Sequence, residues 1–161
     1  MTKRQLTGGD GVSQSSGNGA AGDLTAPPAH CGGDLFDDPT RDSYRIAGRL
    51  QAFGFQMIPV NPFAAGTRIH GEPCYASLTE IPGKIDMVDV FRRPALVDPI
   101  VDEAIACGAD ILWLQLGVVN EAAARRAQEA GLTVVMDRCT SRDYRRFFLS
   151  PPAAGSKETS T

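Results

Sequence analysis

Short apolar runs alternate along this chain with segments in which apolar residues recur every three or four positions. A continuous apolar run of this length predicts a strand that is buried on both faces of a sheet. Four segments predict strands, FQMIPV at 55–60, KIDMVDVF at 84–91, ILWLQLG at 111–117 and LTVVM at 132–136, and of these ILWLQLG is the continuous apolar run.

The periodic segments between the runs predict helices. The first begins at Asp42 or Ser43, and the second begins at Pro99 behind a cap at Asp98. An alanine-rich helix follows a cap at Asn120, and a last helix begins at Thr140. A short helical turn is expected within SLTEIP at 77–82. Strands that alternate with helices predict an α/β fold with an open, doubly wound parallel sheet.

The first helix should follow a strand, but the sequence before it lacks the pattern of one. Residues 1–34 hold 8 of the 17 glycines and no aromatic residue. Such a composition is typical of disorder, because it offers little apolar surface to bury. The tail at 150–161 has the same character. We therefore expect one globular domain at 35–149, between two disordered ends.

Charge and cysteine spacing exclude several classes of function. The net charge is -3 and the pI is near 5.3, which does not favour nucleic-acid binding. No apolar run approaches the roughly 20 residues of a membrane span, and no signal peptide is recognisable, so we expect a cytoplasmic protein. The four cysteines are too widely spaced for a metal pair or a disulfide framework, and neither His30 nor His70 lies in a ligand pattern, so no metal site is expected.

In an open α/β sheet, ligands bind beyond the carboxyl ends of the strands. The residues at those ends are Asn61-Pro62, Arg92-Arg93-Pro94, Gln115-Leu116-Gly117 and Asp137-Arg138-Cys139. Guanidinium groups and helix N-termini favour a phosphorylated, nucleotide-like ligand. The alternatives are a solvated arginine pair at a strand end and an ordinary buried Cys139. Asp89 and Asp137 are separate carboxylates, which gives no sign of acid–base chemistry and no catalytic residue.

Five blocks of sequence resemble a known family. They are PTRDSYRIAGRLQAFGFQMIPVNP, HGEPCYASLTEIP, IDMVDVFRR, WLQLGVVNEAAARRAQEAGLTVVMDRC and the closing arginine-aromatic helix. In this order, from about Leu35 to Phe148, they resemble the stand-alone CoA-binding proteins of bacteria. That family is similar to the N-terminal CoA-binding domain of the succinyl-CoA synthetase alpha subunit.

The resemblance implies a Rossmann-like fold that holds coenzyme A or acyl-CoA along the strand ends. The positions that match the family's CoA-binding blocks are Arg41 and Ser43, Asn61 and Pro62, Phe91, Arg92 and Arg93, and Gln115 and Gly117. The first pair matches the phosphate-side loop and the second the block that approaches the adenosine. The phosphohistidine loop and the ligase domains of the synthetase have no counterpart here, so the resemblance implies binding without an established reaction.

The chain departs from the family at its first strand. Members begin with an apolar strand and a glycine-rich turn, where this chain reads AHCGGDLFDD with Asp34 at the turn. Because Pro27, Pro28 and the paired glycines argue against a central strand, we expect the first strand to be absent or replaced. That loss predicts a marginal fold and weakened CoA binding. Two explanations for the segment at 1–34 remain open. Either it comes from a misassigned start or a shifted reading frame, or the chain is divergent and tolerates the missing strand or borrows one from a partner.

The expected function is non-enzymatic binding of CoA or acyl-CoA, a small nucleotide-containing ligand, with any protein partner unknown. One alternative is a nucleotide-dependent enzyme, either an oxidoreductase or an acyl-CoA ligase component, although no G-x-G-x-x-G motif is present. Another is a thiol redox sensor in which Cys139 forms a mixed disulfide with CoA.

Overall fold

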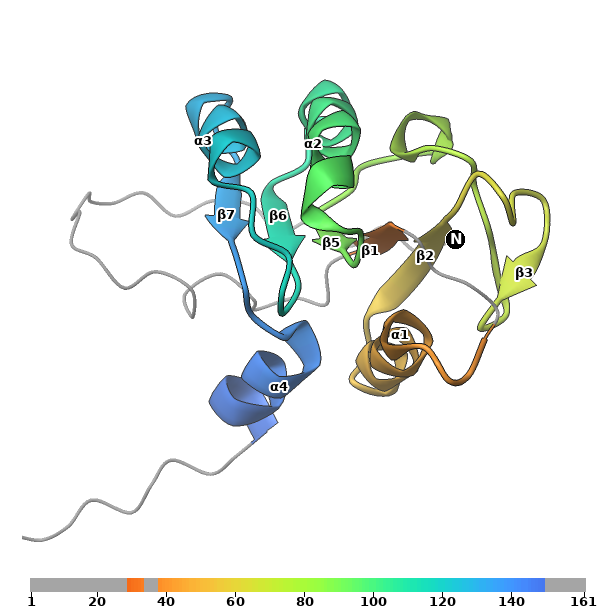
Figure 1. Cartoon of the computed structure of the whole chain (residues 1–161). Helices are drawn as coiled ribbons and strands as arrows, with labels where there is room; N and C mark the ends of the chain where they lie inside the picture. Colours follow the sequence, from red (N-terminus) through yellow and green to blue (C-terminus); the bar gives the residue numbers. More distant parts are fainter. Residues whose placement is uncertain (1–28, 34–37, 150–161) are drawn as a thin grey trace, which may run out of the picture.

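The main sheet of the protein has five strands, and all of its strand pairs are parallel (Figure 1). The computed structural model describes residues 29–33 and 38–149 of the chain. In the order β2-β1-β5-β6-β7 across the sheet, the strands are β2 (Gln56–Val60), β1 (Ala29–Gly33), β5 (Met87–Val90), β6 (Ile111–Leu114) and β7 (Thr133–Val135). Of the segments predicted to be disordered, 1–34 and 150–161, residues 29–33 form β1, and the rest lie outside the described residues, as do residues 35–37.

Helices cover both faces of the sheet, which confirms the doubly wound, Rossmann-like fold. The helices are α1 (Asp42–Ala52), α2 (Val97–Ala106), α3 (Glu121–Glu129) and α4 (Thr140–Tyr144), which continues as η3 (Arg145–Leu149). Figure 1 shows α2 and α3 on one face and α1 and α4 on the other. Short elements complete the order: β3 (Arg68–Ile69), β4 (Glu72–Pro73), η1 (Leu78–Glu80) and η2 (Pro94–Leu96). No helix in the described residues is long and apolar enough to cross a membrane.

The prediction that the first strand is missing is wrong. Strand β1 lies in the middle of the sheet, between β2 and β5, and Cys31 is in register with Ile58 on one side and Val88 on the other. The two prolines precede the strand, and its glycines keep the N–H and C=O groups that a ladder needs. Both neighbouring strands present backbone donors and acceptors that require partners when buried. Backbone pairing therefore forms a strand here without an apolar sequence pattern.

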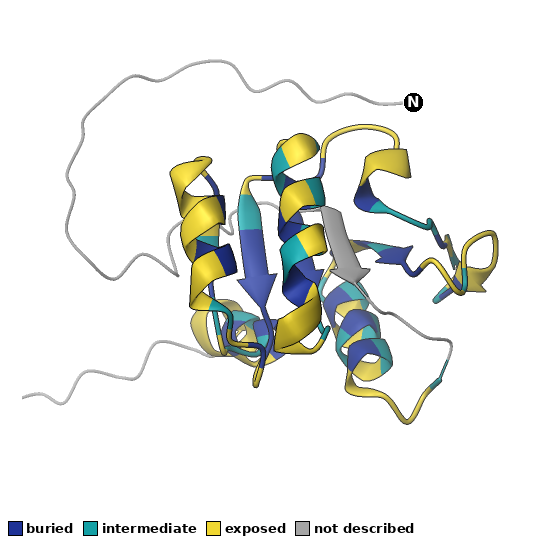
Figure 2. Ribbon diagram, turned by 45° about the horizontal axis from the view of Figure 1, so that its top comes forward, coloured by how far each residue is buried: buried dark blue, intermediate teal, exposed yellow. Residues whose placement is uncertain are grey.

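Apolar side chains pack on both faces of the sheet. One cluster joins β5 and β6, through residues such as Val88 and Leu112, to the small residues of α2 and α3. A second cluster joins Leu50 of α1 to Met57 of β2 on the opposite face. In Figure 2 the helices are buried toward the sheet and exposed on their outer sides. Burial on two faces explains why β6 is a continuous apolar run and why β5 is apolar at every position except Asp89.

The predicted helix caps are only partly right. Asn120 caps α3, and its Oδ1 accepts a hydrogen bond from the backbone N–H of Ala123 at 3.0 Å. Helix α2 instead begins at Val97, with Leu96 rather than Asp98 at its cap. The preceding turn η2 runs directly into α2, so Asp98 lies inside the helix, and its carboxylate pairs with Arg126 of α3 at 3.0 Å.

Candidate functional site

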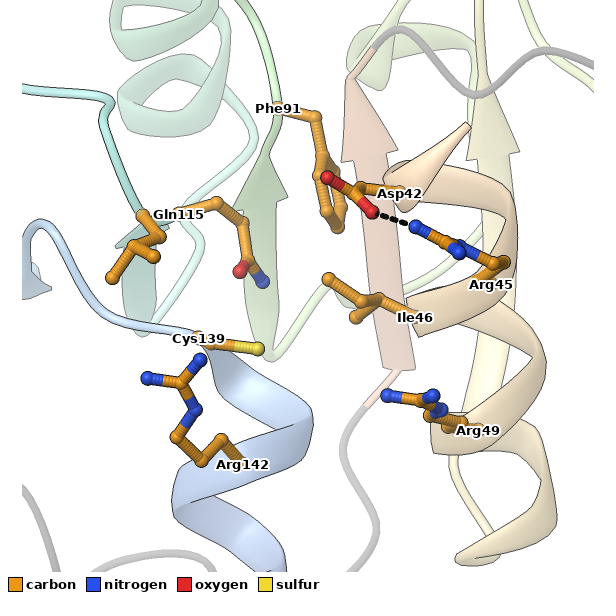
Figure 3. A pocket seen from close by; sticks show the side chains of 9 residues that line it. Asp42, Arg45, Ile46, Arg49, Phe91, Gln115, Cys139 and Arg142 are labelled. Atoms are coloured by element: carbon orange, nitrogen blue, oxygen red, sulfur yellow. Dashed lines mark hydrogen bonds and ion pairs between the residues drawn. The ribbon is translucent and has the colours of Figure 1, made fainter. Parts of the chain in front are cut away.

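A pocket of about 280 Å³ lies between α1 and α4, beside the carboxyl ends of β5 and β6 (Figure 3). We call it the α1–α4 pocket. Its lining residues are Asp42, Arg45, Ile46 and Arg49 of α1, Phe91 after β5, Gln115 and Leu116 after β6, and Cys139 and Arg142 at α4. Strand order reverses between β1 and β5, so the pocket is close to the point where open α/β sheets bind ligands.

Three arginines give this pocket a positive rim. Arg45 and Arg49 lie on the same side of α1 because they are four residues apart. Arg142 of α4 lines the same pocket, with its side chain drawn to the left of Cys139, on the side away from α1 (Figure 3). Arg45 pairs with Asp42. Within the described parts of the chain, neither Arg49 nor Arg142 forms an ion pair with a carboxylate. Two guanidinium groups are thus available to bind an anion such as a phosphate.

A buried polar cluster lies behind the pocket and joins β5, β6 and α4. The Gln115 amide Nε2 donates to Asp89 Oδ1 at 2.7 Å and to the Thr140 hydroxyl. The same hydroxyl donates to Asp89 Oδ2 at 3.0 Å. Both oxygens of the carboxylate therefore have a donor, and both hydrogens of the amide have an acceptor.

One atom of this cluster has no partner. Gln115 is only 3% exposed, and its Oε1 makes no hydrogen bond with any described residue. An unsatisfied buried acceptor costs roughly 1–3 kcal/mol, so such atoms are uncommon. Figure 3 shows the Gln115 amide pointing toward the space between α1 and α4. The oxygen itself has almost no accessible surface, so no ligand atom reaches it in this conformation.

The carboxyl group of the cluster is electrostatically unusual. Burial raises the pKa of Asp89 from 3.8 to about 7, while the hydrogen bonds from Gln115 and Thr140 lower it. Loss of hydration is the largest cause of the raised pKa, because the side chain is fully buried and no positively charged group offsets the effect. The protonation state of Asp89 therefore changes near neutral pH.

The turn after β6 is held by its own contacts. Gly117 has a φ of +80°, which favours glycine, and its N–H donates to Asp137 Oδ1 at 2.7 Å. The N–H group that an anion would use is thus already bonded. The structure gives Gly117 a role in the turn, and direct ligand contact remains a prediction.

A second pocket of about 200 Å³ lies on the other face, between the ends of β2 and β5. Its lining is mainly apolar and consists of Val60, Pro62, Ala76, Leu78, Arg92, Leu96, Pro99, Ile100 and Glu103. The carboxylate of Glu103 accepts a hydrogen bond from the Leu78 N–H at 2.9 Å. We call this the β2–β5 pocket.

The structure divides the predicted site residues between these places. Phe91 and Gln115 line the α1–α4 pocket, whereas Pro62 and Arg92 line the β2–β5 pocket. The other predicted residues line neither pocket and are Arg41, Ser43, Asn61, Arg93 and Gly117.

Local contacts account for three of these remaining residues. Arg41 occupies the N-cap position of α1 without a capping hydrogen bond from its side chain, and its guanidinium lies 3.6 Å from the Asp38 carboxylate. Ser43 is buried in the first turn of α1. The fully buried Asn61 accepts a hydrogen bond from the Phe63 N–H at 2.9 Å, which fixes the turn after β2.

Sequence reasoning missed the arginines of the pocket rim. The spacing of Arg45 and Arg49 on one predicted helix was a usable signal, because residues four apart share a side of a helix. Arg142 gave no such signal, since only the packing of α4 beside α1 brings it to the same pocket. In the described residues, no group of three or more His, Cys, Asp or Glu gathers into a possible metal site.

Solved structures from several organisms share the fold of this chain. A hypothetical protein from Pyrococcus horikoshii OT3 is 35% identical, with a TM-score of 0.70, and the match covers 73% of this chain and 82% of that one. A dinucleotide-forming acetyl-coenzyme A synthetase from Ca. Korarchaeum cryptofilum has a TM-score of 0.60 at 21% identity. The match covers 69% of this chain but only 26% of the synthetase, and at this identity it supports the fold alone.

Sequence relatives identify the family. The uncharacterized protein YneT of Bacillus subtilis is 39% identical over 105 residues, which are 65% of this chain and 76% of the relative. The family described as CoA binding domain matches residues 34–145 of this chain. The match includes the rim arginines and the buried cluster, and the chain belongs to the CoA binding domain family.

Proposed function

We propose that this protein binds coenzyme A or an acyl-CoA at the carboxyl edge of its sheet and catalyses no reaction itself. The observation that carries the proposal is the α1–α4 pocket, which is lined at the strand ends by Arg49 and Arg142, two arginines without carboxylate partners among the described residues. Coenzyme A offers phosphates that these guanidinium groups can bind. We also expect a cytoplasmic, bacterial setting for this binding.

The chemistry of the pocket favours binding over catalysis. Guanidinium and amide groups hold an anion and a polar chain, which is what a carrier such as CoA needs. The carboxyl with a shifted pKa, Asp89, is fully buried behind Gln115 and bonded on both oxygens. It orients the amide of the pocket, and a nucleotide-dependent enzyme is the less favoured alternative.

Removing either unpaired guanidinium should weaken CoA binding. We expect Arg49→Ala and Arg142→Ala each to raise the Kd for CoA by about tenfold to a hundredfold, because each loses a charge-assisted contact with a phosphate. Isothermal titration calorimetry measures the change. The matched control is Arg125→Ala on α3, an exposed arginine on the opposite face of the sheet, which should keep the wild-type Kd.

Two outcomes would contradict the proposal. One is an unchanged Kd in both pocket variants. The other is found by thermal shift assays of the wild-type protein with CoA, acetyl-CoA, NAD and ATP, if only NAD raises the melting temperature.

A second candidate function is thiol–disulfide exchange with CoA, favoured by the position of Cys139 in the pocket wall. Figure 3 shows its Sγ directed toward the space between α1 and α4. In this reaction the Cys139 thiolate attacks one sulfur of CoA disulfide, the S–S bond breaks, and one CoA leaves as a thiolate. Burial raises the pKa of the Cys74 and Cys107 thiols, which disfavours the same reaction there.

Mass spectrometry tests this second candidate. After incubation with CoA disulfide, the wild-type protein and Cys107→Ser should gain the mass of one CoA, and Cys139→Ser should gain none. An adduct mapped to Cys74 or Cys107, or no adduct in the wild-type protein, would rule the exchange out.

A further inference from the structure

The beginning of α4 is held to the sheet by a side chain that can lose a proton. The hydroxyl group of Thr140, the first residue of α4, lies 3.0 Å from Asp89 Oδ2 and shares a hydrogen bond with it. We propose that this contact is a latch, which stays closed while Asp89 is protonated and opens when Asp89 ionises. Cys139 and Arg142, which line the α1–α4 pocket from this part of the chain, move away from the sheet as the latch opens (Figure 3).

The two ends of α4 are held by different kinds of contact. Residues 139–142 include no large apolar side chain, and the carbonyl oxygen before them, of Arg138, accepts a hydrogen bond from the indole N–H of Trp113 at 2.7 Å. At the other end, the ring of Tyr144 stacks on that of Phe53, with 5.3 Å between the ring centres. Hydrogen bonds hold the start of the helix and aromatic packing holds its end, so the start can separate from the sheet while Tyr144 stays packed.

Burial makes the ionised form of Asp89 unfavourable only while the latch is closed. The side chain is fully buried, and loss of hydration raises its pKa to about 7, although hydrogen bonds from Gln115 and Thr140 lower it. Movement of Thr140 admits water to the carboxyl group and returns its pKa toward the ordinary 3.8. Between these values the closed form keeps a proton that the open form has lost. Opening therefore becomes more favourable as pH rises through this interval.

Other ionisable side chains lie on the elements around Asp89, and none of them is a cause of its raised pKa. They are Arg138, Cys139, Arg142 and Asp143 at α4, Asp42, Arg45 and Arg49 on α1, Asp137 after β7, and His30 of β1, which is in register with Met87. Arg138 and Asp143 pair with each other at 2.6 Å, so this ion pair moves together with α4. Ionisation of Asp89 is thus the titration that controls the latch.

Hydrogen exchange of the Trp113 indole tests the proposal. Trp113 is the only tryptophan of the chain, so its indole N–H gives one NMR signal, and it exchanges when Arg138 moves away. After correction for exchange of an unprotected indole, we expect the opening constant of the wild-type protein to rise roughly a hundredfold between about pH 5 and about pH 8. In Asp89→Asn it should stay constant. The control Asp102→Asn, on α2, should follow the wild-type protein.

A backbone amide of the sheet supplies the reference for global unfolding. The Gln115 N–H, which donates to the Val90 carbonyl at 3.1 Å, should have a smaller opening constant than the indole. Equal constants at all pH values would show that Trp113 is exposed only by global unfolding, which refutes the latch. An indole that opens equally at all pH values in the wild-type protein refutes it too, as does a rise that persists in Asp89→Asn.

A second variant decides if Asp89→Asn does not fold. Thr140→Val lacks the hydroxyl group of the latch, so its indole opening constant should exceed that of the wild-type protein even at about pH 5, and an unchanged constant would contradict the proposal. These measurements use the protein without a ligand, so the inference goes beyond the proposed function. Failure to bind CoA would refute that function and not the latch, whereas a pH-independent indole would refute only the latch.

Discussion

Replacing Cys31 with proline should lower the free energy of unfolding by at least about 3 kcal/mol, from a lost ladder bond, an unsatisfied carbonyl and the clash of the ring. Cys31 is the middle residue of β1, which has a parallel neighbour on each side. Its N–H therefore lies inside a continuous ladder. Because a domain of this kind is stabilised by only about 5–15 kcal/mol, the loss is a large part of the total.

The control for this experiment is Cys31→Ala, which keeps the backbone N–H. Urea unfolding followed by circular dichroism compares the two variants. A proline variant as stable as the alanine variant would show that residues 29–33 do not form the central strand. The expected difference would also count against a misassigned start, because a segment foreign to the domain would not stabilise its sheet.

Replacing Asp89 with asparagine should change how stability depends on pH. The unfolded Asp89 ionises near pH 3.8, while its pKa in the folded protein is about 7. Between these values the folded protein keeps a proton that the unfolded chain has lost, so this group lowers stability as pH rises through the interval. The loss approaches about 4 kcal/mol over three pH units and then levels off. An asparagine side chain cannot ionise, so the variant escapes this loss.

Urea unfolding of both proteins at several pH values between about 4 and 8 measures the effect. As pH rises, the free energy of unfolding of the wild-type protein should fall relative to that of Asp89→Asn. Asp102→Asn is a control, because that carboxylate is exposed on α2 and pairs with Arg126 at the surface, where ion pairs contribute about 0–1 kcal/mol. Parallel pH curves for wild type and Asp89→Asn would show that the Asp89 pKa is not raised.

The elements of the fold were predictable where the signal is local. Mainly apolar segments marked β2, β5, β6 and β7, and helical spacing marked α1 and α3, because burial imposes these patterns on the sequence. The Asn120 cap was predictable for the same reason, since it bonds to an N–H three residues away. The prediction of a cap at Asp98 was wrong because η2 runs directly into α2, so the helix begins before Asp98. The position of η2 depends on the conformation of the chain that precedes it.

The site was predictable only in outline. Phe91 and Gln115, which were predicted at the strand ends, line a pocket, because parallel strands bring their carboxyl ends to one edge of a sheet. The separation of Pro62 and Arg92 into a second pocket could not be predicted, since both pockets lie at the same edge and differ only in the face of the sheet.

The sequence by itself determined the order of strands and helices, the α/β class and the family, because each rests on local spacing or on matched residues. Only the tertiary structure decided that β1 exists, since its partners across the sheet, and no apolar pattern of its own, stabilise it. Tertiary packing also brought Arg49 and Arg142 to the lining of one pocket and buried Asp89 behind Gln115. Contacts between segments far apart in the chain leave no period in the sequence, so they arise only when the helices and strands pack.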